Sequence, residues 1–355
     1  MAIYDTRHTT FGVYQGSSGH TSVPHLPLEL VLNITTTIPA SPDQLLNAAH
    51  PTTKLLLTFT LVCHETRRLA NHHLRQHCIH LDSQRRLDCF LQCIPAQPSL
   101  KVVTSISLAP FGEQFEVVEL YLSVRDLLSY TWQTLTKLVV DIPLRKLYLG
   151  DDDFSAHPVL LDGFRKPVNL EEFVSAQDDW CLNASEEGTC VWSQWQKLKR
   201  LALWNVWADE DFWRHVALHD ALEVVVLPST DDMMKVEPKA EYFKHGKRPI
   251  RVIISRSVVI GRQRPASSLF IRYANWEIDD PENNMGLFMH HYAADSDRFG
   301  DGDHQRYIKE AAEDGALWDY EYEEVIHPSQ LDSDSFVHRR SPEDDFSGVL
   351  FDFQS

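Results

Sequence analysis

The sequence predicts an α/β protein in which an N-terminal helical unit is followed by an irregular solenoid with parallel strands. Three observations lead to this prediction. Apolar residues recur at helical spacing between residues 26 and 74, a leucine-rich template returns through the middle of the chain, and negative charge is concentrated near the C-terminal end. The 355 residues, 43% of them hydrophobic, suffice for two or three structural units with a sizeable core.

The composition shifts along the chain divide it into five parts. Residues 1–23 are expected to be a flexible N-terminus, 24–95 a helical domain, 96–275 a repeat domain, 276–328 a C-terminal capping segment and 329–355 an acidic tail. The tail is rich in serine and aspartate, so it lacks the apolar surface that would offset the entropy of ordering it.

Two short amphipathic helices are expected in the helical domain. The first begins at Pro27, a favourable first-turn residue because its missing N–H would be unpaired there anyway. After a polar loop at 39–54, the second carries the apolar stripe from Leu55 to Ala70. Two such helices bury little surface alone, so part of their apolar face is left for a partner or for the rest of the chain. An ordinary helical pair packed on its own domain is the alternative.

These residues resemble an F-box, a helical module that docks proteins on a Skp-family adaptor. The first half of the motif is carried by Leu26, Pro27, Glu29, Leu30, Val31 and Ile34. The second half is carried by Leu56, Leu61, Val62, Cys63, Arg67, Arg68, Leu69 and Ala70. Two features depart from the pattern: Thr66 stands where the family has an aromatic residue, and the segment between Ile34 and Leu55 is longer than usual.

A template L-x-x-L-x-L recurs in degenerate form after the helical domain. Its regular copies are Leu144/Leu147/Leu149, Leu170/Phe173, Leu198/Leu201/Leu203, Leu222/Val225/Leu227 and Ile250/Ile253. Their starts lie 26, 28, 24 and 28 residues apart, which is typical of leucine-rich repeats. Earlier candidates are Val103/Ile106/Leu108 and Leu135/Leu138/Val140. Residues 115–131 have helical spacing and are expected on the convex side of an early repeat.

The repeats predict a specific register. Parallel strands are expected near 199–203, 223–227 and 251–255, with one core column formed by Leu201, Val225 and Ile253. Alternation along the strands then places a second set on an open concave face, the candidate surface for binding a substrate protein. This set is Lys146, Tyr148, Glu172, Arg200, Trp204, Val252 and Arg256. One or two of the tryptophans between 192 and 213 are expected to be exposed as interface anchors. A single irregular α/β domain with evenly spaced strands is the alternative.

The C-terminal part is expected to contain one helix within an acidic region. Residues 279–355 hold 20 acidic and 5 basic residues, so they carry −15 of the net charge of −18. The helix is expected from His304 to Asp314 with Gly315 as its cap, followed by Leu317-Trp318 folding back onto the domain. This ending resembles that of fungal F-box-like proteins, and we expect it to cap the open end of the solenoid. Beyond residue 328, apolar side chains that can dock are Phe346, Val349, Leu350, Phe351 and Phe353.

Composition excludes several classes of function. The chain is acidic and has no basic stripe, which argues against a nucleic-acid partner. No apolar run is long enough for a membrane span, no signal peptide is recognisable, and the six cysteines are sparse. The sequence therefore indicates a cytoplasmic or nuclear protein with reduced thiols. The one local basic patch is interpreted as a solvated helix face, and comprises Arg67, Arg68, Arg75, Arg85 and Arg86.

No motif for catalysis or for a cofactor is found in the sequence. His73 and His77 have the spacing of a zinc pair, with Cys78 and His80 nearby, but no second ligand pair or general base accompanies them. Residues 295–306 resemble a calcium loop only in part, because Phe299 and Arg306 stand where oxygen ligands are required. We therefore expect no enzyme, no cofactor and no metal site.

The resemblance implies a substrate receptor of a cullin-type, SCF-like ubiquitin ligase. It would bind a Skp-family adaptor, and through it a cullin, while the repeat face selects an unknown substrate protein. The implied adaptor contacts are Leu26, Pro27, Leu30, Val31, Ile34, Leu56, Leu61, Val62, Cys63 and Leu69. A leucine-rich-repeat scaffold that recruits no ligase is the alternative, and a hydrolase on an irregular α/β fold is a third.

Overall fold

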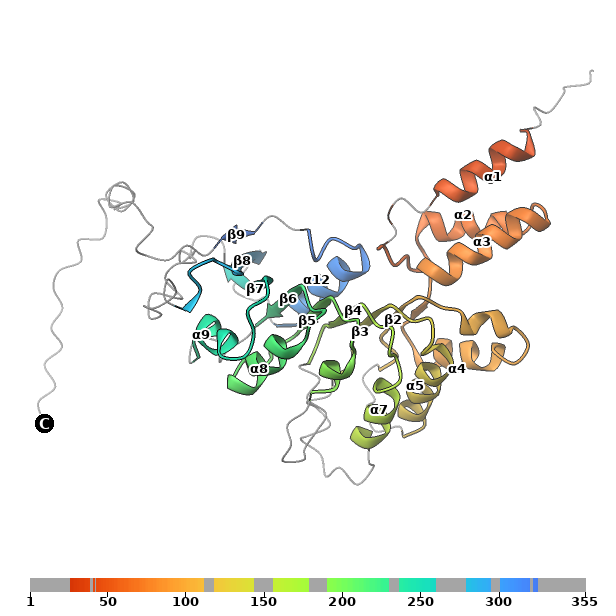
Figure 1. Ribbon diagram of the computed structural model, residues 1–355. Helices are drawn as coiled ribbons and strands as arrows, with labels where there is room; N and C mark the ends of the chain where they lie inside the picture. Colours follow the sequence, from red (N-terminus) through yellow and green to blue (C-terminus); the bar gives the residue numbers. More distant parts are fainter. Residues whose placement is uncertain are drawn as a thin grey trace, which may run out of the picture.

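The structure is a computed structural model of the chain, and it describes residues 26–38, 41, 43–111, 118–143, 156–178, 190–229, 236–259, 279–294, 301–319 and 322–324. Within these residues, a unit of three helices lies at one end of a sheet whose strands follow one another in chain order (Figure 1). The α/β class and the parallel sheet are as predicted. None of the described helices is both long and apolar enough to cross a bilayer.

The helical unit consists of α1 (Leu28–Thr37), α2 (Pro51–Phe59) and α3 (His64–His77). The prediction of one continuous helix from Leu55 to Ala70 is wrong, and α2 begins inside the predicted loop, with Pro51 at its first position. The break has a local cause. Cys63 is extended, and its backbone N–H donates to the Thr66 hydroxyl at 3.1 Å, which caps the first turn of α3. The same hydroxyl donates to the Phe59 carbonyl at 2.9 Å, so Thr66 closes the turn between the two helices.

The described residues form a sheet of nine strands in sequential order. They are β1 (His80–Leu81), β2 (Ser105–Leu108), β3 (Lys137–Val140), β4 (Glu172–Ser175), β5 (Arg200–Leu203), β6 (Val224–Pro228), β7 (Ile250–Val259), β8 (Met285–Ala294) and β9 (Glu323–Glu324). β1 to β8 are parallel, and β9 pairs antiparallel with β8. The predicted parallel strands near 199–203, 223–227 and 251–255 are confirmed as β5, β6 and β7. The predicted copy at Leu144/Leu147/Leu149 lies outside the described residues.

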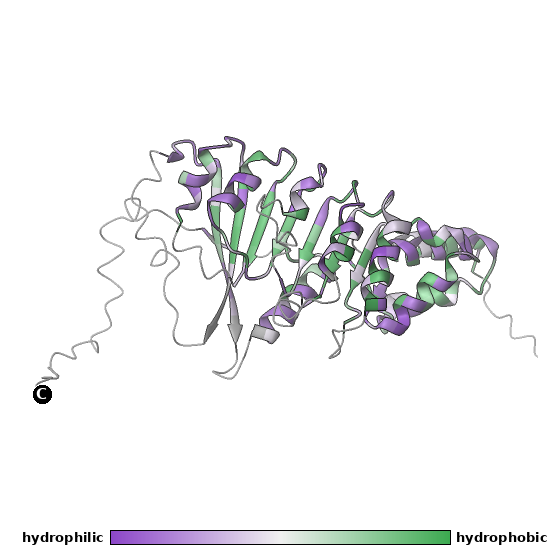
Figure 2. Ribbon diagram, turned by 90° about the horizontal axis from the view of Figure 1, so that it is seen from below, coloured by the Kyte–Doolittle hydropathy of each residue, from purple (hydrophilic) through white to green (hydrophobic). Residues whose placement is uncertain are grey.

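The connections between strands pack on one face of the sheet. They include α4 (Gln84–Cys93), α5 (Val118–Thr131), α7 (Ala156–Phe164), α8 (Glu210–Leu218), α9 (Pro238–Phe243) and the short 3-10 helices η1 (Pro98–Lys101) and η2 (Val191–Gln194). Figure 2 shows largely apolar strands beside helices with polar outer sides. Together these helices and strands enclose the larger core, which contains Val124, Leu138, Phe173, Trp195 and Trp213. α5 accounts for the described part of the helix expected at 115–131.

The predicted core column is correct for β5 and β6 and wrong for β7. Leu201 pairs with Val225, and Val225 pairs with Val252 rather than with Ile253. Val252 is fully buried in the larger core, whereas Ile253 points to the other face of the sheet. The assignment of Val252 to the concave face is therefore also wrong, because the phase of β7 is displaced by one residue.

The opposite face of the sheet is covered by α12 (Asp301–Glu313) and the residues after it. His304, near the start of α12, stacks on Tyr292 of β8, while the carbonyl of Ala312, near its end, accepts from Lys137 of β3 at 2.8 Å. The helix therefore runs across the face of the sheet, and the prediction that it caps an open end is wrong. A smaller second core lies beneath it and includes Val139, Val174, Ala202, Val226, Ile253, Ile308, Leu317 and Trp318.

Gly315 ends α12 and fixes the return of the chain. Its φ of +76° lies in the left-handed region, which glycine adopts without strain. A Cβ at this position would lie 3.2 Å from the Cβ of Asp43, in the connection between α1 and α2. The positive φ and the close approach thus both require glycine here. Leu317 and Trp318 then fold back and are buried, as the sequence predicts.

Candidate docking surface

Exposed apolar side chains are concentrated in the helical unit. Eight large ones are exposed there, and we call them the apolar docking surface: Leu26, Leu28, Leu30, Ile34, Leu55, Leu57, Leu61 and Val62. Across the rest of the described chain only six are exposed, spread between residues 102 and 218. A concentration of exposed apolar side chains in one unit is typical of a site that binds another protein.

The turn between α2 and α3 contributes the most exposed member of this surface, Leu61, together with Val62. Leu61 is 79% exposed and Val62 is 56% exposed, and the turn points away from the sheet (Figure 1). The turn is held by hydrogen bonds: besides the Thr66 bonds, the Nε of Arg67 donates to the Thr60 carbonyl at 2.8 Å. The two side chains are thus presented by an ordered backbone, which lowers the entropy cost of binding.

The structure divides the ten predicted adaptor contacts. Five apolar side chains and one proline are exposed, namely Leu26, Pro27, Leu30, Ile34, Leu61 and Val62. Val31, Cys63 and Leu69 are half-buried. Leu56 is fully buried, so its assignment to the surface is wrong and it belongs to the core of the helical unit. Leu28, Leu55 and Leu57 are also exposed but were not among the predicted contacts. The apolar spacing alone does not distinguish such exposed positions from core positions.

The Cys63 thiol lies at the base of this turn. Its Sγ is 3.4 Å from the Thr66 hydroxyl, and this hydrogen bond lowers the pKa of the Cys63 thiol. A lower pKa increases the thiolate fraction at neutral pH and therefore the reactivity toward alkylating reagents. Cys63 is consequently a native chemical reporter beside the docking surface.

The predicted concave face is a buried interface. Glu172 and Trp204 are 1% and 3% exposed, because α12 and the residues that follow it cover them. Their assignment to an open substrate-binding face is wrong. Arg200 is partly exposed and lies over the Trp318 ring, 5.7 Å from its centroid. Lys146 and Tyr148, and the side chain of Arg256, lie outside the described residues.

A buried ionic network joins three separate segments at this face. The Nζ of Lys137 is 2.8 Å from Glu172 Oε1, and Arg200 Nη2 is 2.8 Å from Glu172 Oε2. Lys137 also donates to the carbonyls of Asp43 and Ala312, at 2.6 and 2.8 Å. The network therefore connects three neighbouring strands to the α1–α2 connection and to α12. Buried charges of this kind are tolerated because each has an opposite charge or a hydrogen-bond partner.

His304 is the most perturbed titratable group of the covered face. Burial lowers the pKa of His304 to about 4, and the neighbouring His290 adds to the effect. Its ring stacks on Tyr292, and its Nε2 lies 2.9 Å from the Ser255 hydroxyl. The imidazole is therefore neutral at physiological pH and acts as a packing residue.

One of the five tryptophans between 192 and 213 is exposed. Trp207 is 63% exposed in the turn after β5, whereas the other four are buried: Trp192, Trp195, Trp204 and Trp213. This matches the expectation of one or two exposed rings. Trp207 lies far along the sheet from the helical unit and forms no part of the apolar docking surface.

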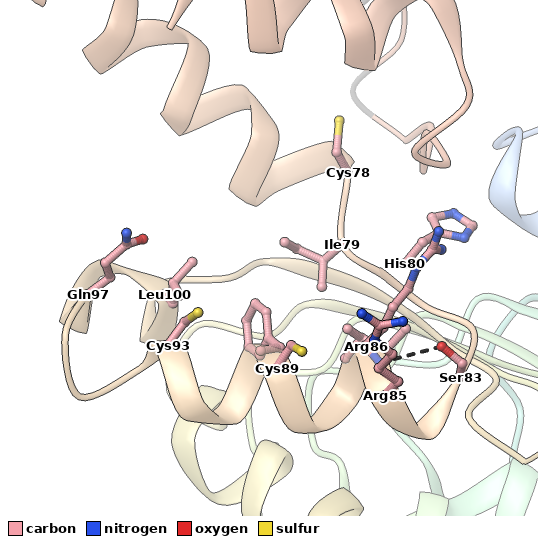
Figure 3. Close-up of a pocket in the computed structure, with 12 residues that line it drawn as sticks. Cys78, Ile79, His80, Ser83, Arg85, Arg86, Cys89, Cys93, Gln97 and Leu100 are labelled. Atoms are coloured by element: carbon pink, nitrogen blue, oxygen red, sulfur yellow. Dashed lines mark hydrogen bonds between the residues drawn. The ribbon is translucent and has the colours of Figure 1, made fainter. Parts of the chain in front are cut away.

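A groove lies between the end of α3 and α4 (Figure 3). It has a volume of about 600 Å³ and is lined in part by Ile79, Phe90 and Leu100. Arg85 and Arg86 stand at one end, and Cys89 and Cys93 face it from successive turns of α4. The groove combines an apolar floor with positive charge, and we refer to it as the α4 groove.

Metal ligands do not come together in the part of the chain that the structure describes: no three His, Cys, Asp or Glu side chains there are arranged to hold an ion. His73 and His77 are neighbours on α3, with ring centroids 6.1 Å apart, and burial is the main cause that lowers the pKa of each. The predicted calcium-loop resemblance falls largely outside the described residues.

Comparison with protein-family models, with curated proteins and with solved structures gave no match to this chain.

Proposed function

We propose that this chain is a substrate receptor of a cullin-type, SCF-like ubiquitin ligase. The apolar docking surface would bind a Skp-family adaptor, the adaptor would connect to a cullin, and the sheet region would hold the substrate protein. The chain itself would perform no chemistry and would act by bringing substrate and ligase together.

The concentration of exposed apolar side chains on the helical unit carries this proposal. Five of the eight lie on α1 and α2, Leu26 precedes α1, and Leu61 and Val62 lie on the turn before α3, which is held by hydrogen bonds. Burying exposed leucine and valine stabilises a complex by about 25 cal/mol per Å² of apolar area. The helical unit lies at one end of the sheet, and its α2–α3 turn points away from the sheet (Figure 1).

Substrate selection requires a different surface from the concave face expected from the sequence, because α12 covers that face. The exposed aromatic side chains of the sheet region lie near opposite ends of the parallel strands: Trp207 follows β5, whereas Tyr130, in the last turn of α5, and Trp132 precede β3. We assign substrate contact to these strand ends, since aromatic side chains are frequent anchors of protein interfaces.

The alternative is a protein-interaction scaffold with the same repeats that recruits no ligase. Co-purification separates the two functions. The full-length chain is co-expressed with a fungal Skp-family adaptor and a cullin, and complexes are resolved by size-exclusion chromatography. A receptor elutes with both proteins, whereas the variant Leu26→Ala/Pro27→Ala, changed at exposed positions only, recovers less adaptor.

A scaffold elutes alone although its circular dichroism is that of a folded protein. That result would favour the alternative. Adaptor binding without recruitment of the cullin would contradict the ligase part of the proposal and leave only the docking part.

A further inference from the structure

The α4 groove has no role in the proposed function. It is separate from the apolar docking surface, since its walls come from the end of α3, β1, α4 and η1 (Figure 3). Its lining is mainly apolar, with Ile79, Phe90 and Leu100 among the contributing side chains. A concave apolar site of this size accommodates a few large side chains of a ligand.

The positive charges around the groove favour a negatively charged ligand. Arg85 is exposed and forms no ion pair with any described residue, whereas Arg86 pairs with Asp82 at 2.5 Å. Arg75, a third positive charge, is on the last turn of α3, three residues before Cys78 of the groove lining. A chain with a net charge of −18 thus has a locally basic, apolar groove, which is complementary to an acidic segment with apolar side chains.

We propose that the α4 groove binds residues 343–353 of the same chain. Their sequence, EDDFSGVLFDF, has four acidic residues, no basic residue, and five large apolar side chains. The phenylalanines and the Val-Leu pair would occupy the apolar floor, and the acidic residues would face Arg85 and Arg86. The proposal is independent of the assignment as a ligase receptor.

The length of the chain permits this contact. The last described residue, Glu324, is in β9, at the opposite side of the sheet from β1. Neighbouring strands are about 4.8 Å apart, so the sheet is roughly 40 Å wide. The 22 residues from Glu324 to Phe346 span at most about 70 Å when extended. Because the segment is tethered, its effective concentration at the groove is on the order of 1 mM, which favours it over a free acidic peptide.

Two native thiols report on occupancy. Cys89 and Cys93 are exposed and line the groove, while Cys63 lies on the helical unit and serves as the internal control. The full-length chain and a Phe346→Ser/Phe351→Ser/Phe353→Ser variant are treated with N-ethylmaleimide, and the alkylation rate of each cysteine is measured by mass spectrometry of its peptide.

The proposal predicts that alkylation of Cys89 and Cys93 is about tenfold faster in the triple variant, with the rate at Cys63 unchanged. Arg85→Glu should also accelerate both, whereas Arg165→Glu, an exposed arginine of the connection after α7, should not. A synthetic peptide of residues 341–355, added to the triple variant, should restore slow alkylation, and a scrambled peptide should not.

Equal rates at Cys89 and Cys93 in the two folded proteins would overturn the proposal. Acceleration at Cys63 as well would also overturn it, because a general loosening of the fold would then explain the result. Protection that is observed only after an acidic peptide of another protein is added would assign the groove to an external partner.

Discussion

Two neighbouring residues of α2 show how burial separates core from surface in the helical unit. Leu56 is fully buried and Leu57 is 50% exposed. We predict that Leu56→Ala lowers the free energy of unfolding by about 3 kcal/mol, because it leaves a cavity. Leu57→Ala should change it by less than about 0.5 kcal/mol. Denaturant unfolding followed by circular dichroism measures both, and equal losses would contradict the assigned phase of the helix.

His304 makes stability depend on pH in a defined direction. Its pKa is about 4 in the folded protein, against an ordinary value of 6.5, so as the pH falls the unfolded chain binds the proton at a higher pH than the folded protein does. The contribution of neutral His304 is therefore complete above pH 6.5 and is lost as the pH falls toward 4. Between pH 7 and pH 5 this residue should account for a loss of about 2 kcal/mol.

The variant His304→Gln removes the titrating group, and its free energy of unfolding should decrease less between pH 7 and pH 5. Burial is the main cause that also lowers the pKa of His77 and His219, so part of the dependence should remain. An unchanged slope in the variant would contradict a neutral, buried His304.

The sequence located the strands but did not determine which face of the sheet each residue of a strand points to. The apolar pattern located β7 but assigned Ile253 to the wrong face, since Val252, Ile253 and Ile254 are all buried, on alternating faces. When both faces of a parallel strand are covered, polar alternation disappears and the hydrophobic run no longer reveals its phase.

Among the elements, α12 has the largest effect on what the sheet can bind. It covers the face that includes Val139, Val174 and Ile253, and the Ala312 carbonyl near its C-terminus accepts a hydrogen bond from Lys137. The amphipathic pattern of its sequence predicts a helix with a buried face, and the structure has one at Asp301–Glu313. The pattern does not say which surface that face meets, because any large apolar surface of the chain would serve.

Truncation separates α12 from the acidic residues that follow it. A chain ending at Pro328 keeps every contact described for α12, so its thermal midpoint should stay within about 2 °C of the full-length protein. A chain ending before Asp301 should expose the second core and leave Lys137 and Glu172 without their cover, so it should aggregate and bind a hydrophobic dye. Equal midpoints for the two truncated proteins would contradict the covering role.

The double variant Leu317→Ala/Trp318→Ala tests the covering role without removing α12. Both side chains are buried in the second core, so this variant should have a lower midpoint than the full-length chain. A matched substitution of the exposed Trp207 by alanine should have little effect.

At the scale of the whole molecule, a row of parallel strands carries helices on one face, α12 on the other and a helical unit at its end (Figure 1). The class, the parallel strands and the location of the helical unit followed from apolar spacing. The sequence did not predict that α12 covers the second face of the sheet, because this depends on long-range packing. It also did not predict the helix break at Cys63, because this depends on the hydroxyl of Thr66. The leucine-rich template predicted from the sequence carries no code for a partner, so the substrate of the proposed receptor has no sequence signature.

The most direct test of the central claim is a calorimetric titration of the full-length chain with a purified Skp-family adaptor. We predict binding with a Kd of about 1 µM or tighter, and at least a tenfold loss of affinity for Leu61→Asp/Val62→Asp, since an aspartate would be desolvated in the interface. Leu218→Asp, at an exposed leucine of α8, should bind as the unchanged chain does. No heat of binding at roughly 50 µM from a folded chain, or equal losses for the two variants, would contradict the account.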